Sequence, residues 1–232
     1  YERTTTAHNS LTFDSCQQAY QPAVAKAPVA NSSWNFSATM DFVRGQSSLY
    51  NGLEGSVMHQ RGVLYVKISN ASLPSYIVVI DKVTTDRSRT VQASWHAHPN
   101  SVVEFVGDAD SRMATVQGVE TGGAAHPTET MVVIIPSSAS AAVGENAGTD
   151  TFDWENASIV RGQQRNASLG VPWQGWYSSN YNGNSTAPTL VYDGRIPETG
   201  ATFGWLLIPQ KHKSSSALAA SLQIKSTSAN GV

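Results

Sequence analysis

The chain has 232 residues, enough for one large domain or two small ones with a sizeable core. Its formal net charge is −2 and only 14% of its residues are charged, which gives no basis for nucleic acid or an anionic membrane as a partner. Its apolar runs have the length of strands, and none approaches the roughly 18 residues that a membrane-spanning helix needs.

The first expected element is a β-strand within residues 4–13. Alternation along this strand places Leu11 and Phe13 on a core face and His8 on the outward face. A chain that begins inside a strand is expected to be a piece of a larger protein, with a missing segment or another polypeptide covering this strand. Cys16 is the only cysteine, so we expect either a buried thiol, which we prefer, or a bond to another chain.

Short apolar runs follow, many with a period of two, separated by clusters of Gly, Pro, Asn and Asp. Such spacing of Val, Ile, Thr and aromatic residues is typical of a β-sandwich. We therefore predict an all-β fold, in which residues 1–232 form a single antiparallel β-sandwich domain of about ten or more strands, with less than about a tenth helix. Residues 84–90 indicate a hairpin loop, and residues 137–148 and 178–188 indicate low-complexity loops. The ten candidate strands lie in SLTFDSC, WNFSATMDFV, GSVMHQRGVLYVKIS, SYIVVIDKV, TVQASWHAH, SVVEFVG, MATVQGVE, TMVVIIPS, TFGWLLIP and ALAASLQIKS.

The histidines raise the question of a metal site. His96 and His98 are two residues apart in a predicted strand, so both point to one face and would bind zinc if a third ligand came from elsewhere. The alternative, which we favour, is a solvated or hydrogen-bonded surface pair. His59 is expected to face solvent beside Arg61. Neither a P-loop nor the His-Glu-x-x-His zinc motif occurs in the sequence.

Two tryptophans, Trp173 and Trp176 in VPWQGWYSSNY, are candidates for carbohydrate binding. An aromatic face suits the apolar face of a sugar ring. The alternative, equally weighted, is that they cover an edge of the sandwich.

Six Asn-x-Ser/Thr sequons occur, where chance would supply roughly one or two. An Asn- and Ser-rich composition could produce them without consequence, but we favour a secreted, extracellular glycoprotein. Those at 70, 166 and 184 are expected to lie in loops and to be the surest sites of modification. The six positions are Asn31, Asn35, Asn70, Asn156, Asn166 and Asn184.

The stretch TTAHNSLTFDSCQQ resembles the Thr-x-x-His-Asn-Thr-Leu/Val strand in the C-terminal region of heparinase II/III-like polysaccharide lyases. This family includes alginate-lyase-like and dermatan-sulfate-epimerase-like members. The stretches VMHQRGVLYVK, SYIVVIDKV and TVQASWHAHPNSVVEF resemble its following strands in order, so the resemblance covers roughly residues 3–106. It implies an N-terminal (α/α) toroid before the β-sandwich, and β-elimination at a uronic acid by groups that lie mainly in the toroid.

The resemblance also implies a role for His8, which falls on the sandwich histidine that helps to hold a structural metal, zinc in some members. The chain lacks the family's His-x-His-x-Asp segment and the toroid, so zinc is implied only at a site shared with a missing segment. No catalytic residue is assigned, and the isolated chain is expected to be inactive. The expected partners are a polysaccharide and the missing toroid segment or another chain. The alternative function is that of a non-catalytic extracellular glycoprotein used for assembly or carbohydrate binding.

Overall fold

The computed structural model describes residues 4–19, 33–69, 74–106, 112–118, 130–136, 152–166, 168, 172–180 and 183–211. The elements in these residues are one short 3-10 turn, η1 (Thr5–Ala7), and sixteen strands. This confirms the predicted all-β class. The strands are β1 (Leu11–Phe13), β2 (Gln17–Gln18), β3 (Trp34–Phe36), β4 (Met40–Ser47), β5 (Tyr50–Asn51), β6 (Val57–Val66), β7 (Tyr76–Thr85), β8 (Arg89–His96), β9 (Ser101–Val106), β10 (Met113–Gly118), β11 (Thr130–Pro136), β12 (Trp154–Arg161), β13 (Trp176–Asn180), β14 (Gly183–Thr186), β15 (Pro188–Ile196) and β16 (Ala201–Lys211).

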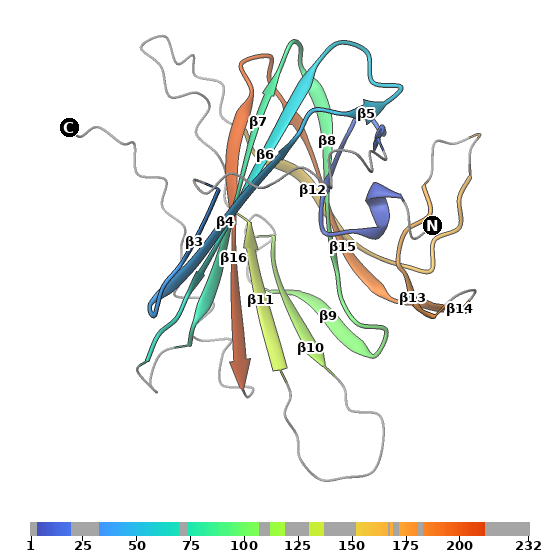
Figure 1. The fold of residues 1–232 in the computed structure, drawn as a ribbon. Coiled ribbons are helices and arrows are strands. Elements are labelled where there is room, and N and C mark those ends of the chain that lie inside the picture. The colour runs from blue at the N-terminus through green and yellow to red at the C-terminus, as the bar shows by residue number, and fades with distance from the viewer. Residues whose placement is uncertain are drawn as a thin grey trace, which may run out of the picture.

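The strands form two main sheets in which all pairings are antiparallel (Figure 1). The smaller sheet has four strands in the order β1-β8-β15-β12. The larger sheet has eight, in the order β3-β4-β6-β7-β16-β11-β10-β9. Two further pairs, β13-β14 and β2-β5, stand outside these sheets. The predicted antiparallel β-sandwich is therefore confirmed.

Aromatic side chains join the two sheets in the core. The indole of Trp205, on β16 of the larger sheet, is fully buried. Its ring centroid lies 5.3 Å from that of Trp95 and 5.1 Å from those of Trp154 and Tyr192, which come from three strands of the smaller sheet. Each such ring removes a large apolar area from water, so this cluster supplies much of the driving force for packing the sheets face to face.

The core also encloses the carboxylate of Asp81 on β7, which is fully buried. Arg61 donates from Nε to Asp81 Oδ1 at 2.7 Å and from Nη2 to Oδ2 at 2.9 Å, and Trp205 Nε1 donates to Oδ2 at 2.9 Å. His59 Nε2 lies 2.7 Å from Oδ1. Burial opposes ionisation, but the hydrogen bonds with His59 and Arg61 hold the pKa of Asp81 below its ordinary value. The expectation that His59 faces solvent was wrong, because its ring is the buried partner of this carboxylate.

A second buried charge, Arg89 at the start of β8, fixes the N-terminal turn against the sandwich. Its guanidinium donates to Asp14 Oδ2 at 2.7 Å and to Asp86 Oδ1 at 2.6 Å. It also donates to the hydroxyl of Thr85 and to the carbonyl of Glu54, each at 2.7 Å. One side chain thus joins three turns that lie far apart in the sequence.

Several sequence expectations need correction. The extended strand expected within residues 4–13 is a 3-10 turn followed by the short strand β1. Leu11 and Phe13 lie in the core as expected, but Thr12 on the opposite face is buried as well, so burial does not alternate along β1. WNFSATMDFV forms the hairpin β3-β4 rather than one strand, because Ser37 caps the turn through its hydroxyl. Residues 178–188, expected to be a loop, include parts of β13 and β15 and all of β14.

Two strands of the smaller sheet, β12 and β15, were not among the candidate strands. The hairpin expected at residues 84–90 was wrong: β7 ends at Thr85 and β8 begins at Arg89, but β7 belongs to the larger sheet and β8 to the smaller one, so the short turn crosses from one sheet to the other. The loop expected at 137–148 and the last candidate strand, in ALAASLQIKS, lie outside the described residues. Among the residues described, no helix has the length and apolar character to cross a membrane.

Candidate functional site

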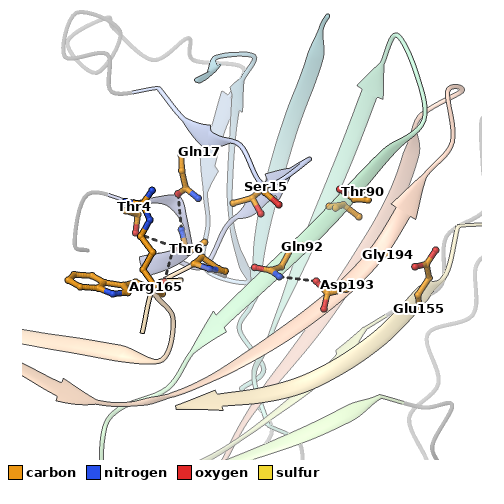
Figure 2. A pocket seen from close by; sticks show the side chains of 14 residues that line it. Thr4, Thr6, Ser15, Gln17, Thr90, Gln92, Glu155, Arg165, Asp193 and Gly194 are labelled. Atoms are coloured by element: carbon orange, nitrogen blue, oxygen red, sulfur yellow. Dashed lines mark hydrogen bonds between the residues drawn. The ribbon is translucent and has the colours of Figure 1, made fainter. Parts of the chain in front are cut away.

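A cleft of about 830 Å³ opens on the outer face of the smaller sheet (Figure 2). Strands β1, β8, β15 and β12 provide its floor, and the segments around η1 and Trp173 provide a wall. Its volume lies within the range of about 300–1,000 Å³ that is usual for small-molecule sites. The lining residues are Thr4, Thr6, Thr12, Ser15, Gln17, Thr90, Val91, Gln92, Glu155, Arg165, Pro172, Trp173, Asp193 and Gly194.

Strand register builds the floor of the cleft. Thr12 of β1 pairs with Gln92 of β8, and Gln92 pairs with Asp193 of β15, so the three side chains stand in one row on the outer face. Gln92 Nε2 donates to Asp193 Oδ1 at 2.9 Å, and Gln174 Nε2 donates to Gln92 Oε1 at 2.8 Å. Because Gln174 is only 2% exposed, this chain of hydrogen bonds starts from a fixed, buried amide. It holds the Asp193 carboxylate in a single orientation.

The charged groups of the cleft are separated. Glu155 lies at the bulge where the pairing of β12 with β15 shifts, and it lines the cleft beside the row that ends at Asp193. Arg165 lies at the opposite end, near Thr6 (Figure 2). Among the described residues, neither Glu155 nor Arg165 has an ion-pair partner, and the Oδ2 atom of Asp193 accepts no hydrogen bond. These groups are therefore available to a ligand.

Trp173 stands on the wall of the cleft with 40% of its surface exposed. The hydroxyl of Thr6 donates to the Trp173 carbonyl at 3.2 Å, and Gln163 Nε2 donates to the Pro172 carbonyl at 3.0 Å. Gln174, on the other side of Trp173, is anchored to the floor of the cleft. The backbone that carries Trp173 is thus held on both sides, which fixes the point on the wall from which its indole extends.

Trp176 has a different setting. It is half-buried at the start of β13, donates from Nε1 to the carbonyl of Gln163 at 2.9 Å, and does not line the cleft. The two tryptophans named by the sequence are therefore not brought together in one site.

The three histidines considered as ligands have different surroundings. His8 is exposed at the end of η1. His96 ends β8, with Nε2 3.0 Å from the carbonyl oxygen of Thr6 and Nδ1 3.1 Å from Asn9 Oδ1. Burial lowers the pKa of His96 to about 4, although the Thr6 carbonyl opposes this shift. His98 follows the strand, and its ring contacts that of Tyr177 with centroids 5.6 Å apart.

A zinc ion needs three or four protein ligands in tetrahedral geometry. No group of three or more His, Cys, Asp or Glu side chains comes together within the described part of the chain. These residues alone do not fit a zinc shell around His8 or around His96.

The remaining predicted positions are mostly on the surface. Four of the sequon asparagines are exposed, and Asn31 and Asn70 lie outside the described residues. Asn184, expected in a loop, lies in β14. Cys16 is half-buried, and burial raises the pKa of its thiol. The four exposed asparagines are Asn35, Asn156, Asn166 and Asn184.

Sequence reasoning named Trp173 but missed the polar floor below it. Gln92 and Asp193 are 101 residues apart and meet only through the pairing of β8 with β15. The bulge at Glu155 is equally invisible without the register of β12. Only the carboxylate within the run LVYDGRI could have drawn attention, since charges are rare inside buried strands.

Comparison with known proteins places this fold in a family. A family model described as heparinase II/III-like, C-terminal, matches residues 1–206. The chain belongs to the heparinase II/III-like family. The match extends through most of the two sheets, well beyond residue 106, where the sequence resemblance ended. None of the curated proteins compared with the chain matches it.

Solved heparinase structures share this fold at low sequence identity. Heparan sulfate lyase HepC from Pedobacter heparinus is 14% identical with a TM-score of 0.55, over 91% of this chain and 25% of that chain. The heparinase III-BT4657 gene product is 14% identical with a TM-score of 0.53, over 90% of this chain and 25% of that chain. The heparinase II/III-like chain described here thus spans about a quarter of the length of these enzymes.

Proposed function

We propose that this chain is the C-terminal β-sandwich domain of a secreted polysaccharide lyase-like glycoprotein, and that it acts on a uronate polymer only together with a toroid domain. The observation that carries this proposal is the match to the C-terminal part of the heparinase II/III-like family over residues 1–206. Similar structures include a heparan sulfate lyase, so heparan sulfate is the first uronate polymer to consider. The six sequons support secretion.

The chemistry of β-elimination supports a division of roles, in which the toroid and not the β-sandwich supplies the proton-transfer groups. In β-elimination, a base removes the C5 proton of a uronic acid while its carboxylate is neutralised, and an acid protonates the 4-O leaving group. Among the described residues that line the cleft on the smaller sheet there is neither tyrosine nor histidine. These residues therefore lack the usual pair of proton-transfer groups, which the toroid is proposed to supply.

Activity on uronate polymers tests this proposal. The purified chain is incubated with heparan sulfate and with other uronate polymers, and the ultraviolet absorbance of the unsaturated product is followed. We expect no product from the chain alone, and product when a toroid-bearing segment of the same protein is present. Product from the chain alone would show that the sandwich has its own catalytic site, and would refute the division of roles.

A second candidate function is carbohydrate binding without catalysis. The exposed indole of Trp173 on the wall of a polar cleft favours it, because aromatic faces stack on sugar rings. The intact mass of the native protein distinguishes the two candidates. A helix-rich partner chain that co-purifies favours the lyase, whereas a homogeneous sandwich with its glycans favours the binding protein.

A further inference from the structure

We propose that the cleft on the smaller sheet binds an uncharged glycan and discriminates against sulfated or uronate-rich segments. The inference rests on the second candidate function, carbohydrate binding, and names the class of ligand. Sugar hydroxyls donate to the carboxylate of Asp193, and the apolar face of a sugar ring stacks on Trp173.

The carboxylate of Asp193 is oriented to accept hydrogen bonds from the hydroxyl groups of a ligand. Its Oδ1 atom is held by Gln92, which in turn is held by the buried amide of Gln174. Its Oδ2 atom accepts no hydrogen bond from the described residues. An ionised carboxylate can accept hydrogen bonds but cannot donate them. Its natural partner is therefore a donor, such as a hydroxyl group of a neutral sugar. Because the carboxylate is already oriented, binding costs little additional ordering.

The charges set the selectivity. Asp193 and the bulge residue Glu155 put two carboxylates on the same part of the cleft. Arg165, the one basic residue among the described residues of the lining, lies at the other end (Figure 2). A sulfate or uronate carboxylate placed over Asp193 would meet two like charges, which is unfavourable. The nearest arginine along β15, Arg195, shares this face but is not among the described residues that line the cleft. An uncharged sugar meets no such repulsion, and its hydroxyl groups can donate hydrogen bonds to Asp193.

Trp173 supplies the apolar contact. Its indole is partly exposed, and its backbone is tied down through the Thr6 hydroxyl and the anchored neighbour Gln174. An aromatic side chain on an anchored backbone, beside fixed polar acceptors, gives a sugar ring one stacked face and one hydrogen-bonded edge. This pairing of an apolar surface with a few placed polar groups is typical of small-ligand sites.

Calorimetric titration of the complete chain tests the inference. The ligands are uncharged hexasaccharides of β-linked glucose, xylose and mannose, with a heparan sulfate hexasaccharide for comparison. We expect at least one uncharged ligand to bind more tightly than the heparan sulfate hexasaccharide. Trp173→Ala should weaken that binding about tenfold. The matched control is Trp34→Ala, which removes an indole of similar exposure from β3 and should leave the affinity unchanged.

A charge-removal variant tests the selectivity directly. In the double variant Glu155→Gln and Asp193→Asn, the amide oxygen at position 193 can still accept from Gln92, so the floor should keep its shape. We expect weaker binding of the uncharged ligand, because an amide is a poorer acceptor than a carboxylate, and tighter binding of the heparan sulfate hexasaccharide.

Other results would overturn the inference in distinguishable ways. If the heparan sulfate hexasaccharide binds best and Trp173→Ala weakens it, carbohydrate binding stands but the proposed selectivity is wrong. If no oligosaccharide binds, both the inference and the second candidate function fail, while the lyase proposal is unaffected. If Trp173→Ala and Trp34→Ala act alike, the cleft is not the binding site.

Discussion

The two sheets differ in how far their inner faces are covered. On the larger sheet, Val79, Val63, Val43 and Trp34 pair in succession across four strands and share one face. Exposure rises along this row, from 4% at Val79 to 45% at Val43 and 43% at Trp34. On the smaller sheet, by contrast, every residue of β1 is buried. Eight strands cannot be covered by four, so burial is concentrated where the two sheets overlap.

This difference means that similar substitutions should have very different costs in the two regions. The overlap holds the aromatic cluster and the Asp81 network, whereas the outer strands β3 and β4 carry large apolar groups in contact with water. Paired substitutions, one in each region, test the comparison.

The largest effect is expected at Asp81. Asp81→Ala leaves Arg61 and His59 without their buried partner, so we expect a loss of about 3–5 kcal/mol in the free energy of unfolding. The control is Asp41→Ala on β4, which breaks the partly exposed pair with Lys67 and should cost no more than about 1 kcal/mol. Urea unfolding measures both values. Equal losses would show that the overlap region has no special role.

The next largest effect is expected from a pair of substitutions that remove only apolar groups, one in each region. Leu190 of β15 is 1% exposed, so Leu190→Ala should cost about 2–5 kcal/mol through lost burial and the cavity that remains. Val43→Ala, at the exposed end of the larger sheet, should change stability by about 0.5 kcal/mol or less. The same unfolding measurement checks both. A Val43 variant as damaging as the Leu190 variant would mean that the inner face of β4 is covered in solution.

A smaller effect is expected from pH at the end of β8. The pKa of His96 is lowered by burial to about 4 from the ordinary 6.5, so between these values the unfolded chain binds more protons than the folded one. The contribution of His96 to the free energy of unfolding should therefore be fully present above about pH 6.5. It should decrease as the pH drops toward 4, by at most about 1.4 kcal/mol per pH unit. Unfolding curves at several pH values, compared with His96→Gln, measure this contribution. An identical slope in the variant would assign the pH dependence to other groups.

The smallest effect on stability is expected from the sequons. At least three of the six should carry glycan, and replacing any exposed asparagine with glutamine should change stability by less than about 0.5 kcal/mol. Mass measurement before and after enzymatic removal of N-glycans checks occupancy. No loss of mass would remove the support for secretion. Asn156 is of special interest because it pairs with Asp193 across β12 and β15, so a glycan there would stand beside the cleft.

Sequence patterns predicted the class of the fold but not its pairing. Alternating strands such as β6 and β7 were found because one face of each is apolar. β15 was missed because Thr189, Leu190, Val191 and Tyr192 are all buried, which gives no period of two. The hairpin β13-β14 was mistaken for a loop because Ser, Asn and Gly residues dominate it.

For the candidate site, too, local sequence patterns predicted single residues but not the strand pairing that brings them together. Trp173 could be named from its residue type alone. The floor depends on strands that pair across long separations, and on a bulge that turns Glu155 toward the cleft. His59 was misplaced because its partner, Asp81, is on another strand and draws the ring inward. No local pattern contains this information.

The place of β16 in the larger sheet has a consequence for biosynthesis. It is the last strand described, yet it lies between β7 and β11, and β15 is likewise inserted between β8 and β12. The smaller sheet cannot be completed until β15 has left the ribosome, at residue 196, and the larger sheet until β16 has left it, at residue 211. The emerging chain must therefore hold unpaired strand edges until these two strands appear, and folding dominated by such non-local contacts is slow and prone to aggregation. A nascent chain of this topology is expected to depend on chaperones until its last two strands arrive.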